Sequence, residues 1–239
     1  MEQEIKLSVI IPAYNEEKRL GSTLEQITAF LAKKPFVSEV IVADDGSRDR
    51  SAALAREKLR GIRHQVLEAP VNQGKGSAVQ RGMLAAKGKY RLFSDADLST
   101  PIEETDRFLK YLDEGYEVVI GSRALSGSNV VVSQNRMRET MGRIFNAFAQ
   151  LLAIRGIQDS QCGFKAFTAK AAEDLFRRQK LRGFSFDAEI VFLSQSRGYR
   201  LLETPVTWRN SVQSRVRLLR DPFHMFYDLL KIRWLHRND

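Results

Sequence analysis

The alternation of short apolar runs with amphipathic stretches is the feature that most limits how this chain can fold. Short apolar runs are typical of buried strands, and apolar residues spaced three or four positions apart are typical of helices. The strands expected in the first half are Leu7–Pro12, Glu39–Asp44, Arg63–Glu68, Tyr90–Ser94 and Val118–Gly121. Helices are expected between them, at about 19–32, 49–60, 77–86 and 103–112. This order predicts an α/β fold with a doubly wound, Rossmann-like, mostly parallel sheet and helices on both faces.

The second half of the chain is less regular. Helices are expected at 138–152, 169–176 and 187–196, and strands at 164–167 and 200–205. A final helix would place five apolar side chains on one face, namely Phe223, Phe226, Tyr227, Leu230 and Trp234. That face could lie on a bilayer or pack against the core. No linker divides the chain, so we expect one domain over residues 1–239.

The charge of the chain is unevenly distributed. Residues 1–122 carry 18 Lys/Arg and 19 Asp/Glu, whereas residues 123–239 carry 20 and 10. A basic half attracts nucleic acid, anionic lipid or phosphorylated substrates, although it could also be a solvated surface. The single cysteine, Cys162, excludes an internal disulfide. No signal peptide or apolar stretch of ~18 residues is present, so we expect a cytoplasmic protein that can still lie on a membrane surface.

Two carboxylates follow the fourth expected strand, in the segment "FSDADLST". Ligands bind at the carboxyl ends of the strands in doubly wound sheets. Asp95 and Asp97 stand one residue apart there, and such close like charges are costly unless a cation joins them. Mg²⁺ takes one or two protein carboxylates together with substrate phosphates. The pair therefore indicates a metal and diphosphate site, with a solvated acidic turn as the alternative.

Two further segments stand where this edge of the sheet is expected. Asp44, at the end of the second strand, can accept a hydrogen bond from a nucleobase or a ribose hydroxyl, although "DDGS" also suits a turn that caps a helix. Lys75 lies between two glycines at the start of a helix, which suits an anion site or a flexible turn. The spacing of a Walker A loop is absent.

Six segments together are more specific than any of them alone. They are "SVIIPAYNEE", "VIVADDGSRD", "NQGKGSAV", "DADLSTP", "IGSR" and "DSQCGFKAF". In order and approximate spacing they resemble the family 2 inverting glycosyltransferases with the GT-A fold, and more closely the dolichyl- and polyprenyl-phosphate sugar transferases. "SQCGFK", "FDAEI" and "ETPVTW" are most similar to the β-glucosyltransferase branch, with the mannosyltransferase branch close. The resemblance covers about residues 7–234.

The resemblance implies roles for the matching positions. Asp97 would be the direct ligand of a Mg²⁺ or Mn²⁺ cofactor, and Asp95 would hold the nucleotide and complete the metal site. Arg123 and Arg138 would meet the phosphate of the acceptor. The residues implied to line the nucleoside pocket are Pro12, Tyr14, Glu16 and Asp44.

The chain departs from the family pattern at three places. Ser99 stands where some relatives have a glutamine on the metal, and Gly142 where some have a phosphate-binding serine. Ser214 and Arg215 resemble the family's late "GSK"-like pair, but Gln213 replaces the glycine and Arg215 the lysine. Arginine keeps the charge at this position and adds bidentate phosphate geometry.

The reaction implied is transfer of a hexose, with glucose favoured, from a nucleotide diphosphate sugar such as UDP-glucose to a polyprenyl phosphate. A phosphate monoester is largely ionised at neutral pH and needs positioning rather than a base. A hydroxyl acceptor would need one, for which Asp187 and Glu189 are candidates, with helix capping as the alternative. We also expect a separate membrane partner, because the chain has no spanning helix to move its product.

Other functions fit the same residues less well. GDP-mannose could replace UDP-glucose, and a soluble hydroxyl could be the acceptor. A sugar-1-phosphate nucleotidyltransferase would have a glycine-rich loop where "PAYNEE" stands. A nucleic-acid binder is suggested only by the positive charge, and we expect no nucleic-acid partner.

Overall fold

The computed structural model describes residues 4–132, 146, 148–150, 152, 154–209 and 221–237. Five positions named from the sequence lie outside these ranges: Arg138, Gly142, Gln213, Ser214 and Arg215. Most of the helix expected at 138–152 is also outside them.

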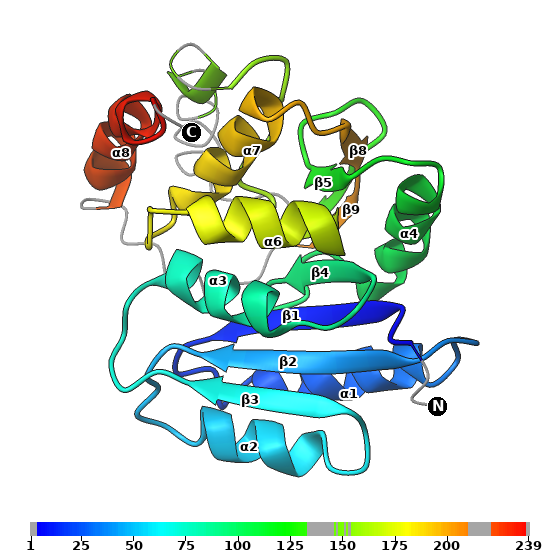
Figure 1. Cartoon of the computed structure of the whole chain (residues 1–239). Coiled ribbons are helices and arrows are strands. Elements are labelled where there is room, and N and C mark those ends of the chain that lie inside the picture. Colours follow the sequence, from blue (N-terminus) through cyan, green and yellow to red (C-terminus); the bar gives the residue numbers. More distant parts are fainter. Residues whose placement is uncertain are drawn as a thin grey trace.

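A central sheet dominates the fold (Figure 1). Within the described ranges it has seven strands, in the order β3-β2-β1-β4-β7-β5-β8. Their bounds are Leu7–Ala13 (β1), Ser38–Asp44 (β2), His64–Glu68 (β3), Tyr90–Ser94 (β4), Val118–Ser122 (β5), Phe164–Thr168 (β7) and Leu201–Pro205 (β8). β7 pairs antiparallel with β4 and β5, and the other pairs are parallel. The mostly parallel, doubly wound α/β sheet predicted from the sequence is confirmed.

Helices cover both faces of the sheet (Figure 1). α1, α2 and α4 pack with the cluster on one face, and α3, α6, α7 and α8 with the cluster on the other. Their bounds are Leu20–Leu31 (α1), Ser51–Lys58 (α2), Lys75–Ala85 (α3), Thr105–Asp113 (α4), Ala169–Arg178 (α6), Phe186–Ser196 (α7) and Asp221–Leu235 (α8). A short 3-10 turn, η1 (Ile102–Glu104), precedes α4.

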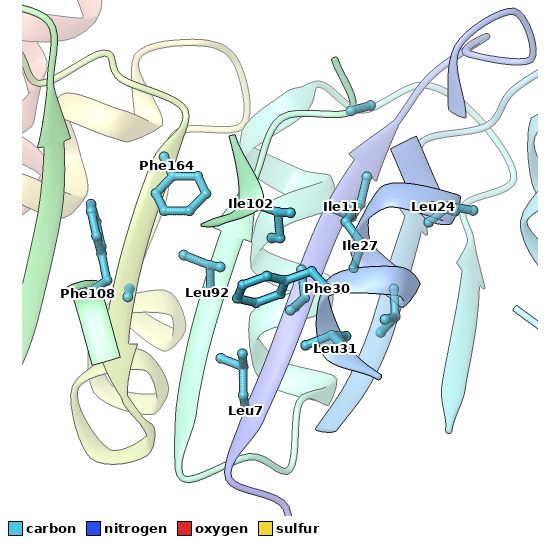
Figure 2. Close-up of a cluster of buried hydrophobic side chains, with 14 of the residues drawn as sticks. Leu7, Ile11, Leu24, Ile27, Phe30, Leu31, Leu92, Ile102, Phe108 and Phe164 are labelled. Carbon is cyan, nitrogen blue, oxygen red and sulfur yellow. The ribbon is translucent and has the colours of Figure 1, made fainter. Parts of the chain in front are cut away.

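Alternating side chains of the strands divide the core between the two faces. On β1, Leu7, Val9 and Ile11 join the cluster under α1, whereas Ile10 joins the cluster under α3. Figure 2 shows the first cluster, in which Ile27 of α1 and Leu92 of β4 lie beside β1. Strands buried on both faces explain why the sequence shows continuous apolar runs rather than alternation.

The direction of β7 determines which loop meets the edge of the sheet where the substrate is expected. Because β7 is antiparallel, its start lies at the edge where its neighbours end, and Phe164 pairs with Ser94 at the end of β4. The segment "DSQCG" just before β7 is thereby brought to the carboxyl ends of the parallel strands. A two-stranded parallel ribbon, β6 (Asn129–Val132) with β9 (Thr207–Arg209), was not expected from the sequence.

α8 separates its apolar side chains between core and solvent. Leu229 and Ile232 are buried in the core. Tyr227, Leu230 and Trp234 are 58%, 59% and 64% exposed, so these members of the predicted apolar face point away from the core. No helix in the described part of the chain is long and apolar enough to cross a membrane.

Candidate active site

The acidic pair lies in a tight turn that follows β4. The Asp95 amide donates to the Gly163 carbonyl (3.0 Å), and the Leu98 amide donates to the Asp95 carbonyl (3.1 Å). Leu98 has a φ of 45°, a backbone conformation that few residues with a side chain adopt. The Asp97 carboxylate accepts from the Ser99 amide (3.0 Å). The turn therefore presents both carboxylates, 35% and 19% exposed, at the edge of the sheet.

Cationic side chains of the chain itself meet both carboxylates. Lys75 Nζ, at the start of α3, lies 2.7 Å from Asp95 Oδ1. Arg19 Nη1 lies 3.7 Å from Asp97 Oδ2, and its guanidinium also donates to the Glu16 carboxylate. These contacts bring together four positions predicted from the sequence, namely Glu16, Lys75, Asp95 and Asp97. Arg19 is a member that the sequence analysis did not identify.

The end of β2 contributes two aspartates with different partners. The Asp44 carboxylate accepts from both the amide and the hydroxyl of Ser47, and it thereby closes the turn of "DDGS". The buried Asp45 carboxylate accepts from the amides of Gln73 (3.0 Å) and Gly74 (2.7 Å). Asp44 therefore stabilises its own turn, whereas Asp45, which was not predicted, anchors the loop that carries Lys75.

Arg123 lies at the end of β5 and is held by a carboxylate. Its Nε and Nη2 donate to the two oxygens of Asp159 (2.6 and 2.8 Å), and its amide donates to the same side chain (3.0 Å). Trp208 lies under the guanidinium, 5.6 Å from the ring centroid. Burial alone would lower the pKa of Arg123, but Asp159 reverses this and raises it. Arg123 is therefore a fixed positive charge, and Asp95 also acts on it electrostatically.

A buried ion pair lies behind the acidic turn. Lys165 of β7 donates to Asp187 of α7 and to the Cys162 carbonyl (2.6 Å), and both charged side chains are almost fully buried. Burial raises the pKa of Asp187, although Lys165 and Lys75 oppose the shift. The charge in the apolar run "FKAF" was a signal for such a pair that the sequence analysis did not use.

The two carboxylates considered as bases are both bonded inside the fold. Asp187 is paired with Lys165, as described above. Glu189 is fully buried, accepts from the amides of Lys180 and Leu181 (both 2.9 Å) and contacts His236 (2.6 Å). Neither position favours proton removal from an acceptor at the edge of the sheet, and Glu189 instead links α7 to α8.

The remaining predicted residues are located as follows. Pro12 is buried at the end of β1, and Tyr14 is partly exposed just after it. The Ser99 carbonyl accepts from the Arg209 amide (2.7 Å). Cys162 is buried, and burial raises the pKa of its thiol to about 11. Arg138, Ser214 and Arg215 belong to the part of the chain that is not described.

The donor set at the acidic turn fits a hard divalent cation. Among the described residues, no group of three or more His, Cys, Asp and Glu side chains converges to hold a metal. Asp95 and Asp97 supply oxygen ligands, and a cation bound by two carboxylates takes its other ligands from phosphates and water. The turn therefore suits Mg²⁺ or Mn²⁺ that arrives with a diphosphate.

The sheet order and the acidic pair at its carboxyl edge define a transferase of the GT-A type that uses a nucleotide diphosphate sugar. The family model described as "Glycosyl transferase family 2" matches residues 8–176, and the chain belongs to that family.

Relatives with assigned names cover most of the chain. A dolichyl-phosphate beta-glucosyltransferase of Dictyostelium discoideum is 36% identical over 96% of this chain and 74% of its own length. The protein of the same name in Drosophila melanogaster is 40% identical, over 85% of this chain and 67% of its own length. Both similarities cover most of the chain and are not confined to the acidic turn.

Solved structures confirm the fold. Glucosyl-3-phosphoglycerate synthase from Mycobacterium tuberculosis, in complex with Mn²⁺, UDP and glucosyl-3-phosphoglycerate, superposes with a TM-score of 0.70 and 22% identity. The superposition covers 98% of this chain and 80% of that one. Mannosyl-3-phosphoglycerate synthase from Rubrobacter xylanophilus gives a TM-score of 0.68 with 19% identity. At these identities the similarity concerns the fold alone.

Proposed function

We propose that this glycosyltransferase moves glucose from UDP-glucose to a dolichyl or other polyprenyl phosphate, with inversion at the anomeric carbon. The observation that carries the proposal is the acidic pair at the sheet edge, where Lys75 contacts Asp95 and Asp95 also acts electrostatically on Arg123. The relatives that are dolichyl-phosphate beta-glucosyltransferases support the same donor sugar and acceptor class.

The donor would bind along the ends of β1, β2 and β4. Pro12, Tyr14, Glu16 and Asp44 are proposed to line the nucleoside pocket, and Lys75 to meet the diphosphate from the start of α3. Asp97, with Asp95, would hold Mg²⁺ or Mn²⁺, which when bound neutralises charge that develops on the nucleoside diphosphate leaving group. Lys75 can share this task because its ammonium lies at the same carboxylate.

The acceptor would bind on the opposite side of the sugar. Arg123 presents a guanidinium whose orientation is fixed by Asp159, and a planar guanidinium suits a phosphate group. A lipid phosphate with a second pKa near ~6 is already ionised at neutral pH, so these residues need only position it and no base is required. Arg138 is proposed as a further contact of the acceptor phosphate on the resemblance alone. On the same ground Ser214 and Arg215 are proposed to bind the phosphates of the donor rather than the acceptor.

The lipid acceptor implies a membrane surface. α8 directs Tyr227, Leu230 and Trp234 outward, and Lys231 and Arg237 lie over the rings of Tyr227 and Trp234. Aromatic side chains beside basic ones suit the interface of an anionic bilayer. We propose that the protein binds the cytoplasmic face of a membrane through this helix, and that a separate membrane partner moves the product onward.

The experiment that tests the proposal measures donor and acceptor together. Purified protein receives labelled UDP-glucose or GDP-mannose, Mg²⁺ or Mn²⁺, and either polyprenyl phosphate or polyprenol in detergent. We expect label in lipid only from UDP-glucose and only with the phosphorylated lipid. Label from GDP-mannose would identify the mannosyltransferase reaction. Transfer to polyprenol or to a soluble hydroxyl would contradict the phosphate acceptor.

A further inference from the structure

The Lys75 ammonium already contacts Asp95, one of the two carboxylates proposed to bind the metal ion. The ammonium lies 2.7 Å from Asp95 Oδ1 and 5.6 and 5.9 Å from the ring centroids of Phe93 and Phe186. A cation in contact with a carboxylate reduces the attraction of that carboxylate for a second cation. Lys75 therefore competes directly with any metal ion that approaches Asp95.

The start of α3 is built to keep the ammonium in this place. Asp45 holds the two amides that precede Lys75, as described above. Gly76 permits close packing, since a Cβ at this position would lie 2.7 Å from Phe186 Cβ. The backbone of Lys75 is thus fixed from both sides, and only its side chain is free to exchange partners.

Lys75 would not lose all electrostatic support if it left Asp95. Its ammonium also experiences the negative charge of Asp187 and lies over the rings of Phe93 and Phe186. Asp187 is itself fixed by Lys165 inside the fold. An ammonium displaced from Asp95 would therefore keep the attraction of Asp187 and of the two aromatic faces.

We propose that Lys75 is an internal counter-ion of the metal site, which gives up Asp95 to the divalent cation only when a nucleotide diphosphate arrives to receive the ammonium. This inference rests on the proposed function, because it needs a diphosphate donor. It makes metal and nucleotide mutually dependent. Each binds weakly alone, because the metal must displace Lys75 and the nucleotide alone faces two carboxylates. By linkage, each raises the affinity of the other by the same factor.

The test compares the Mn²⁺ affinity of the wild type with that of Lys75→Met. Electron paramagnetic resonance measures the concentration of free Mn²⁺ in each titration. Without nucleotide, we expect the variant to bind Mn²⁺ about tenfold more tightly or better, which is a coupling of the ordinary size. Asp95 is one third exposed, so water can solvate it when the lysine is absent. Conversely, calorimetry of UDP binding in the presence of EDTA should show weaker binding by the variant.

Lys110→Met is the matched control, because it removes one positive charge from a lysine that is 74% exposed on α4. It should leave Mn²⁺ affinity unchanged, and near-ultraviolet circular dichroism should show that all proteins are folded. Lys75→Gln replaces the methionine variant if the latter fails to fold.

Equal or weaker Mn²⁺ binding by a folded Lys75 variant would overturn the inference, and so would a failure of the variant to bind Mn²⁺ at all. Failure of the proposed function has a different signature. If the wild type with Mn²⁺ shows no affinity for UDP, the proposed donor is wrong, while the nucleotide-free titration still measures the competition at Asp95.

Discussion

At the scale of single residues, the proposed function depends on the positions of two carboxylates. Asp95 and Asp97 lie in a turn whose backbone is bonded to β7 through Gly163 and to α1 through Thr23, which donates to the Ala96 carbonyl (2.6 Å). These bonds fix the turn on two sides. Each carboxylate can therefore exchange its cationic partner for another while the backbone of the turn stays in place.

Gly163 is the residue whose substitution most directly displaces the acidic turn. A Cβ at this position would overlap the Asp95 carboxylate, so Gly163→Ala must move that side chain. We expect a loss of about 1–3 kcal/mol in the free energy of unfolding, and a fall in kcat/KM of transfer beyond what stability explains. Gly183→Ala is the control, since a Cβ there would have no neighbour within 4 Å. Equal activity of the two variants would show that Asp95 need not stay in place.

Asp159 should make the stability of the protein depend on acid pH. Burial alone would raise the pKa of Asp159, but Arg123 outweighs it, so the pKa is lower in the folded than in the unfolded state. The stabilisation is therefore complete above about pH 4 and is lost as pH falls through the folded-state value. Between pH 5 and pH 2, the free energy of unfolding measured with urea should fall more steeply for the wild type than for Asp159→Asn. Parallel curves would contradict this assignment.

At the scale of elements, connections between strands and helices decide which of these residues meet. The strand ends of β1, β2 and β4 and the acidic pair could be predicted from the sequence, because apolar runs and parallel connections determine them. The charge of Lys165 in an apolar run could have indicated a buried pair, but the neighbours that Asp159 and Lys165 meet could not be predicted, since they depend on the antiparallel direction of β7. Strand direction follows from which neighbours the strand finds in the sheet, and local sequence does not encode it.

The junction between β2 and α3 gives a prediction at this scale. Asp45→Ala removes the acceptor of two loop amides and leaves them without a carboxylate partner. We expect the free energy of unfolding to fall by about 1–3 kcal/mol. The KM for the donor should rise more than kcat falls, because the loop positions Lys75. Donor titrations with Asp45→Ala and Asp45→Asn would check this. A reduced kcat at an unchanged KM would argue against a role in donor binding.

At the scale of the whole molecule, charge and apolar surface are distributed in a way that suits a lipid-linked acceptor. The net positive charge lies in residues 123–239, and the exposed apolar side chains of α8 belong to the same half. The apolar pattern of α8 was predictable from the sequence. The outward direction of Tyr227, Leu230 and Trp234 was not, because Leu229 and Ile232, which lie outside the predicted face, pack into the core.

The outward face of α8 should be needed for membrane binding. We expect Leu230→Glu/Trp234→Glu to abolish most of the sedimentation with vesicles of phosphatidylcholine and phosphatidylglycerol, because it places charge where apolar groups would insert. Ile62→Glu/Val71→Glu makes the same charge change at exposed apolar positions elsewhere and should bind like the wild type. Salt should weaken the binding of the wild type to vesicles without abolishing it, because salt screens the charged contacts but not the apolar ones. Equal binding by both double variants would exclude α8 as the contact.

We propose that the acidic turn holds the donor diphosphate through a metal ion, and one measurement of transfer tests this directly. It is the rate at which label from UDP-glucose enters polyprenyl phosphate, for the wild type and Asp97→Asn, across a range of Mg²⁺ and Mn²⁺ concentrations. Glu103→Gln, at an exposed carboxylate nearby, is the control. We predict metal-dependent transfer by the wild type and the control, and a loss of about 100-fold or more in Asp97→Asn with an unchanged melting temperature. A wild-type rate of transfer in Asp97→Asn would contradict a role of this carboxylate in holding the metal ion.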